Sequence, residues 1–278
     1  MSRAALHLGP VTRLVGELFV LLACASILVP LLVMLGTAFK PNAEMYSPAP
    51  WPLNPTLENF ERLFDQLPFA LQLFNSSVNA IIRVLGQVFT SVLAAYAFAR
   101  WRFPGRDILF FAVIGAMMVP HQLTMVPIYL LIVNLGWYDT LAALIVPNLV
   151  APFGIFLLRQ HFLSLPRELF DAAAVDGASS LQTLWHVSLP LLKPAIGALA
   201  IVFFIESWNE YFWPLLVTET ARSATVQMGL RQYIDLESSS DFGPLMAGML
   251  IATLPVLAVF FFFQRQVFET FAQTGLKG

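Results

Sequence analysis

The sequence has little charge for its length and almost no cysteine. Only 12% of its 278 residues are Asp, Glu, Lys or Arg, whereas hydrophobic residues make up 58%. Because soluble domains carry charge on roughly a quarter of their residues, an ordinary soluble domain is excluded. Cys24 is the single cysteine, which excludes an intramolecular disulfide and a cysteine metal site. The composition therefore indicates a polytopic membrane protein.

The sequence also lacks the motifs that mark enzymes and nucleotide-binding proteins. It contains no G-x-x-x-x-G-K-[ST] loop for nucleotide phosphates and no G-x-S-x-G nucleophile turn. Its four histidines show no H-E-x-x-H or other ligand spacing, and no basic tract with interleaved aromatics suggests nucleic acid binding. We therefore expect that the chain has no catalytic residue, holds no metal or cofactor, and takes its energy from a partner.

Six stretches are long and apolar enough to cross a bilayer, which takes about 20 residues of helix. We therefore predict an all-α membrane protein with six transmembrane helices, in which residues 1–278 form a single membrane domain. The first stretch runs past Pro30 to Lys40 with no small-residue cleavage pattern, so we interpret it as a retained span. The six stretches are residues 14–38, 74–98, 108–133, 140–162, 191–217 and 244–265.

Lys and Arg are distributed unevenly between the predicted loops. With the N-terminus in the cytoplasm, the inside segments carry ten of these residues and the outside segments four. Because cytoplasmic loops carry the excess of positive charge, both termini are predicted to be cytoplasmic. The inside set is Arg3, Arg13, Arg100, Arg102, Arg106, Arg159, Arg167, Lys193, Arg265 and Lys277, and the outside set is Lys40, Arg62, Arg222 and Arg231.

Residues 166–190, which we call the elbow, form a polar segment that begins with the pattern of a short helix. Pro166 suits a first helical turn, where a missing N–H costs nothing. Gly177 stands where the end of this helix needs a left-handed residue. The apolar face of the helix is formed by Leu169, Phe170, Ala173 and Ala174.

The elbow continues with the pattern of a second helix. Ser179, followed three residues later by Gln182, predicts a capping box at its start. Pro190 and Pro194 are predicted to mark its end. The whole segment therefore reads as helix, glycine turn and helix, on the cytoplasmic side of the membrane.

The elbow resembles the hallmark cytoplasmic loop of the permease subunits of binding-protein-dependent ABC importers. That loop reads E-A-A, three residues, G, nine residues and I-x-L-P. Here Asp171-Ala172-Ala173 is followed after three residues by Gly177, and after nine more by Val187-Ser188-Leu189-Pro190. Asp171 replaces the usual Glu and Val187 the usual Ile, so charge and branching are kept.

This resemblance implies a type I ABC importer permease fold, in which the elbow is a coupling helix that docks on a cytoplasmic ATPase. It implies as partners a second, homologous permease, two ATP-binding cassette subunits that use ATP and Mg, and an extracytoplasmic solute-binding protein. It also implies the inner membrane of a prokaryote. The ATPase-coupling residues would be Glu168, Asp171, Ala172, Ala173, Asp176, Gly177, Ala178, Leu189 and Pro190. The alternative is an amphipathic loop helix resting on the bilayer surface.

Arg83 lies inside the second predicted span, and Glu206 and Glu210 lie inside the fifth. Ionisable groups are costly in lipid and indicate a functional site. Carboxylates, an amide and Trp ring faces suit polyhydroxyl solutes, so we expect this segment to line a translocation path. The candidate path residues are Glu206, Trp208, Asn209, Glu210 and Trp213.

The same residues also allow a purely structural interpretation. Trp208, Tyr211 and Trp213 would then be an interfacial aromatic belt, and Glu206 would pair with Arg83. Prolines interrupt the third and fourth spans, and the kinks serve either a hinged gate or packing alone. These prolines are Pro120, Pro127, Pro147 and Pro152.

Two further patterns resemble the maltose-type branch of these importers. Residues 208–216 fit W-N-x-[FY]-x-W-P-L-L, and the predicted cytoplasmic tail, residues 266–278, ends in Lys-Gly. The tail departs from the commoner form, because Phe271 stands near a usual Gly and one residue is missing before Lys277. The resemblance implies a carbohydrate importer. The alternatives are a permease for sn-glycerol-3-phosphate or another polyol, a secondary transporter with an internal repeat, or a membrane-embedded enzyme.

Overall fold

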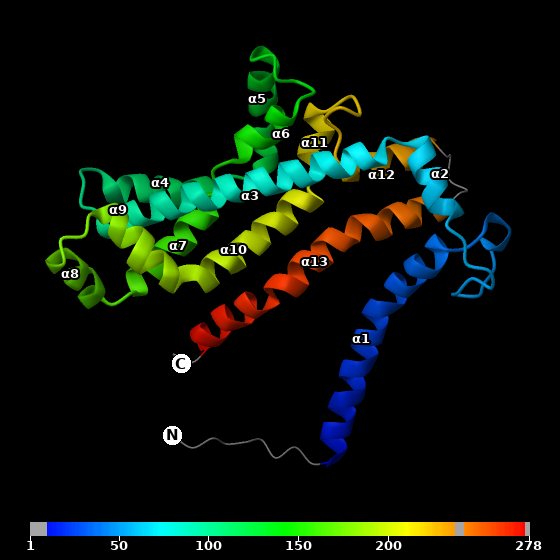
Figure 1. Cartoon of the computed structure of the whole chain (residues 1–278), viewed down its shortest axis with the longest axis horizontal. Helices are drawn as coiled ribbons and strands as arrows, with labels where there is room; N and C mark the ends of the chain where they lie inside the picture. The colour runs from blue at the N-terminus through cyan, green and yellow to red at the C-terminus, as the bar shows by residue number, and fades with distance from the viewer. Residues whose placement is uncertain (1–9, 237–241, 276–278) are drawn as a thin grey trace. The chain divides into compact units, whose positions relative to one another are not determined.

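The computed structural model describes residues 10–236 and 242–275 of the chain. Over these residues the chain is built of helices and contains no β-strand, which confirms the predicted all-α fold. The helices divide between two compact units, and Figure 1 labels them in chain order. The predicted tail begins within the last turns of α13 (Phe242–Gly275), while residues 276–278 lie outside the described residues.

The first unit is held together at the end of its long helix. The carboxamide of Asn59 donates hydrogen bonds to the carbonyl oxygens of Ala38 and Lys40, at 3.0 and 2.8 Å. Because the last carbonyls of a helix have no partner inside the helix, Asn59 caps α1 and fixes α2 beside its end. The unit contains α1 (Pro10–Ala38), a 3-10 turn (Asn42–Glu44), α2 (Glu58–Gln66), the end of α12 (Val226–Leu236) and the start of α13.

The second unit contains most of the membrane-spanning helices. Its centre is α3, and Figure 1 shows α7 and α10 running along it, in agreement with their contacts. Its elements are α3 (Phe69–Arg100), α4 (Arg106–Met118), α5 (His121–Asn134), α6 (Leu141–Ile145), a 3-10 turn (Val146–Asn148), α7 (Pro152–Ser164), α8 (Arg167–Val175), α9 (Ser180–Gln182), a π-helical segment (Thr183–Ser188), α10 (Leu189–Asn209), α11 (Phe212–Val217), and the remaining parts of α12 and α13.

Three of the predicted spans are interrupted: the third between α4 and α5, the fourth between α6 and α7, and the fifth between α10 and α11. Among the described residues, five helices are long and apolar enough to cross a membrane, and a sixth span is formed if α4 and α5 are counted together. These two helices meet at a bend of 100°, where Pro120 lacks the N–H that would continue the helix. In the fifth span, α10 ends at Asn209 and α11 begins at Phe212. Pro214 explains this second break, because its ring would clash with the carbonyl of residue 210 in a continuous helix.

A buried polar face runs the length of α3 and meets these interruptions. Its members recur every three or four residues and so lie on one side of the helix. They are Gln72, Asn75, Ser76, Asn79, Arg83, Gln87 and Ser91. Beside them, Thr90 donates a hydrogen bond to the carbonyl of Leu149, at the break before α7 (2.9 Å). Ser76 accepts one from the N–H of Val226 at the start of α12 (2.8 Å).

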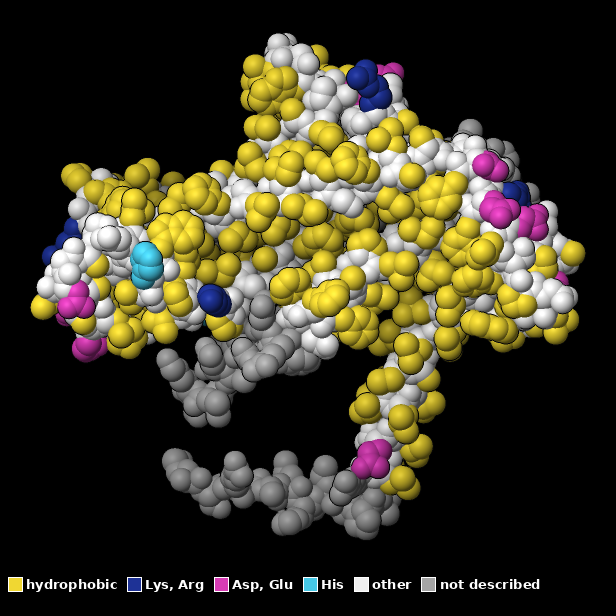
Figure 2. Space-filling view, in the orientation of Figure 1, with side chains coloured by type: hydrophobic (Ala, Val, Ile, Leu, Met, Phe, Trp, Pro, Cys, Tyr) yellow, Lys and Arg dark blue, Asp and Glu magenta, His cyan; other side chains and the backbone are white. Residues whose placement is uncertain are grey.

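The apolar core of this unit lies between α3, α7 and α10. Phe162, Leu184 and Leu199 are among its fully buried members. Gly154 allows α7 to approach closely, because a Cβ atom there would lie 3.0 Å from Ser91 Cβ and 2.9 Å from Phe203 Cζ. Figure 2 shows hydrophobic side chains covering the surface over α3 and α10 as well, as expected for helices in lipid.

This close approach gives a stability prediction. We expect Gly154→Ala to destabilise the protein by about 1–3 kcal/mol, because the added methyl group overfills a packed contact. The thermal unfolding midpoint in detergent measures the effect. Gly115→Ala is the matched control, since a Cβ at Gly115 in α4 would meet nothing within 4 Å. Adding Ser91→Gly should restore part of the lost stability, and equal midpoints for the Gly154 and Gly115 variants would contradict the packing account.

Candidate functional site

The first half of the elbow folds as the sequence predicts. Pro166 is the N-cap residue and α8 follows it directly. Gly177 has φ = 74°, which confirms the left-handed turn. The N–H of Ala178 donates to the carbonyl of Ala173 at 2.9 Å, and that of Gly177 to Ala174 at 3.1 Å. This pair of bonds is a Schellman motif, so the turn ends α8 with its carbonyls satisfied.

The second half confirms the predicted start and corrects the predicted end. Ser179 and Gln182 form the capping box: the N–H of Gln182 donates to Ser179 Oγ, and that of Ser179 to Gln182 Oε1. Pro190 and Pro194, however, do not end the helix. The π-helical segment leads from α9 into α10, and Pro190 lies in the first turn of α10. The wider π turn accommodates a proline that a regular helix would exclude, so the elbow continues directly into the fifth span.

The elbow is attached to the end of α3 by two side chains that the sequence interpretation did not single out. The guanidinium carbon of Arg100 lies 3.1 Å from the centroid of the Phe170 ring in α8. Arg100 also donates a hydrogen bond to the carbonyl of Phe162 (3.3 Å). One turn earlier, the hydroxyl of Tyr96 donates to the carbonyl of Ser180 (3.0 Å). The sequence signal for this attachment was the spacing of Tyr96 and Arg100, an aromatic and a cationic residue four positions apart at the end of a predicted span.

The predicted coupling residues do not all face outward. Glu168, Asp171, Ala172, Asp176, Gly177 and Pro190 are exposed, Ala178 and Leu189 are half-buried, and Ala173 is buried. Ala173 therefore packs α8 against the chain itself. The apolar side chain of Val175 is 88% exposed beside them, and Figure 2 shows charged side chains gathered over α8.

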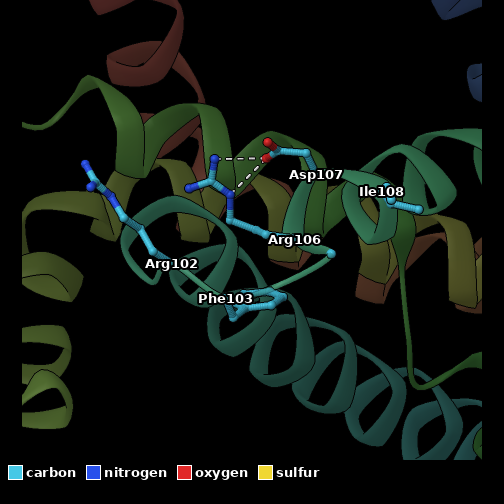
Figure 3. Close-up of a pocket in the computed structure, with 6 residues that line it drawn as sticks. Arg102, Phe103, Arg106, Asp107 and Ile108 are labelled. Carbon is cyan, nitrogen blue, oxygen red and sulfur yellow. Dashed lines mark hydrogen bonds and ion pairs between the residues drawn. The ribbon is translucent and has the colours of Figure 1, made fainter.

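A second polar feature lies in the loop between α3 and α4. A hollow of about 440 Å³ is lined by Arg102, Phe103, Gly105, Arg106, Asp107 and Ile108. Figure 3 shows Arg106 and Asp107 directed toward one another, and their ion pair is 2.9 Å long. Asp107 thus neutralises Arg106, and the hollow holds a local ion pair at the start of α4.

In the middle of the second unit, Arg83 pairs with a different carboxylate from the one predicted. Its Nη1 donates to Glu210 Oε2, and the two side chains are 8% and 14% exposed. The predicted Arg83–Glu206 pair is therefore wrong. Glu210 is the first residue beyond α10 and has extended backbone geometry, so the break in the fifth span turns its carboxylate to Arg83. A continuous helix would have kept it on the face of Glu206.

The two tryptophans of this segment are interior residues. Trp208 is 3% exposed and its Nε1–H donates to the carbonyl of Ala252 in α13 (2.9 Å). Trp213 is 1% exposed and donates to the carbonyl of Ala143 in α6 (2.9 Å). We therefore remove Trp208 and Trp213 from the candidate path residues and from the aromatic-belt interpretation. Their rings are covered by the chain itself, so they contact neither a solute nor the membrane interface.

Glu206 and Asn209 remain as exposed polar groups near the C-terminal end of α10. Within the described residues, Glu206 forms no ion pair inside 4 Å, although Arg83 and Glu210 are its charged neighbours. A charged side chain facing lipid is costly, by up to about 3 kcal/mol at the middle of a span. This face of α10 is therefore better suited to water or to another protein than to lipid.

The loop between α5 and α6 is fastened outside the spans by Asp139. Its carboxylate accepts hydrogen bonds from the N–H groups of Glu219 (2.9 Å) and Thr220 (3.0 Å) and from the hydroxyls of Thr220 and Ser223. Burial alone would raise the pKa of Asp139, but these hydrogen bonds hold it well below its usual range. The carboxylate therefore stays ionised, and it joins the loop after α5 to the loop after α11.

Sequence comparison identifies similar proteins over most of the chain. Residues 87–270 match the family described as binding-protein-dependent transport system inner membrane component. The arabinooligosaccharides transport system permease protein AraQ of Halalkalibacterium halodurans is 32% identical, over 90% of this chain and 91% of that protein. The sn-glycerol-3-phosphate transport system permease protein UgpE of Rhizobium meliloti is 32% identical, over 95% and 98%.

Solved structures show the same fold. A chain in the crystal structure of a bacterial ABC transporter involved in the import of the acidic polysaccharide alginate superposes with a TM-score of 0.84. The match covers 95% of this chain and 98% of that chain, at 23% sequence identity. A second alginate ABC transporter structure, in complex with an alginate pentasaccharide-bound periplasmic protein, gives a TM-score of 0.61 at 15% identity.

Proposed function

The chain belongs to the family of inner membrane components of binding-protein-dependent transport systems, and we propose that it moves a carbohydrate across the inner membrane in step with ATP hydrolysis by partner subunits. Membership makes it a multi-pass transport subunit rather than an enzyme. The observation that carries the proposal is the elbow, whose capped turn presents an exposed surface while Arg100 and Tyr96 hold it to a spanning helix.

In this proposal the membrane domain works as one permease unit within a larger complex. A second, homologous permease would complete the path, and two ATP-binding cassette subunits, with ATP and Mg, would dock on the exposed residues of the elbow. A solute-binding protein would deliver the solute from outside; the similar alginate transporter was crystallised with a periplasmic protein of this kind. Closure of the ATPases would pull the elbows together and open the spans outward, and hydrolysis would reset them.

We place the elbow and both termini on the cytoplasmic side of the membrane. The positive-inside distribution supports this orientation, and the loop beside α4 carries Arg102 and Arg106 on the same side as the elbow. The Asp139 fastening then lies outside, where it shapes the surface available to the binding protein. The last residues of the proposed cytoplasmic tail would reach toward the ATPases.

The elbow proposal is tested at Gly177. A β-branched side chain is strained at φ = 74° by about 1–3 kcal/mol, although the space around it is open. Gly177→Val should therefore distort the turn, abolish solute uptake and leave the chain in the membrane. Gly177→Asn should retain uptake, because Asn tolerates the left-handed conformation. Uptake into cells and membrane abundance by immunoblot are the two measurements.

Gly105 provides the matched control for this substitution. It also has positive φ, 80°, with nothing within 4 Å of an added Cβ, but it lies in the loop before α4. Gly105→Val introduces a similar backbone strain outside the elbow and should leave most of the uptake. Wild-type uptake in Gly177→Val, or equal loss in both variants, would contradict the assignment of the elbow as the ATPase contact.

We further propose that the exposed face of α10 lines the path, with Glu206 and Asn209 as the groups that meet the solute. Support comes from the cost of placing Glu206 in lipid, which water in a path avoids. Glu210 acts on the path indirectly, since Arg83 holds its carboxylate. An amide and a carboxylate next to each other suit hydroxyl-rich solutes, because they accept and donate several hydrogen bonds.

The relatives point to two solute classes. AraQ is named for arabinooligosaccharides and UgpE for sn-glycerol-3-phosphate. We favour a carbohydrate, since a polyhydroxyl solute needs no cation in the path, and the carboxylate of Glu206 would repel a phosphate ester. Glycerol-3-phosphate or another polyol phosphate is the second candidate, because the Rhizobium meliloti relative covers 95% of the chain.

The path proposal predicts separable effects on transport and assembly. Asn209→Ala and Glu206→Gln should reduce uptake of labelled arabinooligosaccharides at least several-fold, while binding of the ATPase subunits and basal ATP hydrolysis stay near normal. Glu58→Gln, which removes an exposed carboxylate outside the spans, should change neither. Parallel uptake of labelled glycerol-3-phosphate distinguishes the two solute classes. Normal uptake of both solutes in both α10 variants would overturn the path assignment.

A further inference from the structure

Two interrupted spans meet at one carboxylate. Glu210 lies at the break between α10 and α11, and His121 is the first residue of α5, at the 100° bend after α4. His121 Nε2 lies 3.9 Å from Glu210 Oε1, while Glu210 Oε2 accepts from Arg83 on α3. One side chain therefore contacts an uninterrupted helix on one side and a second broken span on the other.

The two contacts of Glu210 differ in character. The pair with Arg83 is a direct, charge-assisted hydrogen bond between two buried side chains, which are 8% and 14% exposed. Such a pair is costly to separate, because either partner alone would be a buried charge. The contact with His121 is longer than a hydrogen bond, and the imidazole is 49% exposed. It depends mainly on charge, so it can form or open at low cost.

We propose that Glu210 is a positioning residue that couples the bend of the third span to the break of the fifth, with Arg83 as its fixed anchor and His121 as its releasable partner. The inference rests on the proposed transport function. Contact between His121 and Glu210 holds the two breaks in the arrangement seen here. Its loss frees α5 to move relative to α11, and the two interrupted spans then no longer bend as one.

The strength of this contact depends on whether His121 carries a proton. Histidine is the side chain whose charge changes between about pH 5 and 8, and a neutral imidazole at 3.9 Å attracts a carboxylate only weakly. The charged groups that face the contact are Arg83 from α3, Glu206 from the preceding turn of α10, and Glu210 itself. Arg83 and Glu210 form an ion pair with one another, so Glu206 is the remaining anionic side chain beside the contact.

The test uses the assembled complex of this chain with its partner permease and ATPase subunits, reconstituted in nanodiscs. Basal ATP hydrolysis without solute is measured from about pH 5.5 to 8, the range of histidine titration. The complex with His121→Gln should hydrolyse ATP roughly five-fold faster than the wild-type complex at the acidic end, because this variant lacks the charged contact. At the alkaline end the two complexes should hydrolyse ATP equally fast. His121→Lys should match wild type at the acidic end and be slower at the alkaline end.

Two controls separate this role from a general loss of structure. His161→Gln, on α7, removes a histidine outside the junction and should keep the wild-type pH profile. In a Glu210→Gln background, the His121 substitutions should lose their effect, because their common partner is gone. Variant-to-wild-type ratios that do not change with pH for both His121 variants would overturn the inference. Failure of the wild-type chain to assemble with any ATPase would instead overturn the proposed function, and the inference with it.

Discussion

A membrane helix that stops and restarts leaves backbone N–H and C=O groups without partners, and lipid cannot supply them. This constraint governs the second unit, in which the third, fourth and fifth spans are all interrupted. Polar side chains of α3 lie at these breaks. Thr90 donates a hydrogen bond to the carbonyl of Leu149 at the break before α7, and Arg83 binds the side-chain carboxylate of Glu210 at the break after α10. Near the start of α3, Asn75 donates to the carbonyl of Ala224, in the loop after α11, at 3.0 Å.

The same helix links the two ends of the proposed mechanism. At its C-terminal end, Arg100 and Tyr96 hold the elbow, so a displacement of α8 is transmitted to α3 directly. At its middle, Arg83 anchors Glu210 at the junction of two breaks. The elbow is also continuous with α10 through the π-helical segment. Movement of the elbow therefore has two routes to the middle of the second unit: its contacts with α3 and its continuous chain into α10.

Local sequence signals predicted the parts of the fold that depend on nearby residues. The Gly177 turn and the Ser179–Gln182 capping box could be predicted because each is a contact within a few residues. The partner of Arg83 could not, because it depends on where α10 stops. The burial of Trp208 and Trp213 could not be predicted for a related reason. An indole suits both a membrane interface and a protein interior, and only the positions of the Ala143 and Ala252 carbonyls decide between them. The attachment of Arg100 to Phe170 likewise brings together residues far apart in the sequence.

We propose that α3 is the fixed reference against which the interrupted spans bend. Cryo-electron microscopy of the assembled complex, nucleotide-free and ATP-bound, tests it most directly. We expect the Arg100–Phe170 and Arg83–Glu210 contacts to persist in both states, while the angles between α4 and α5 and between α10 and α11 change. Separation of α3 from the elbow, or unchanged angles at both breaks while the path opens, would contradict it.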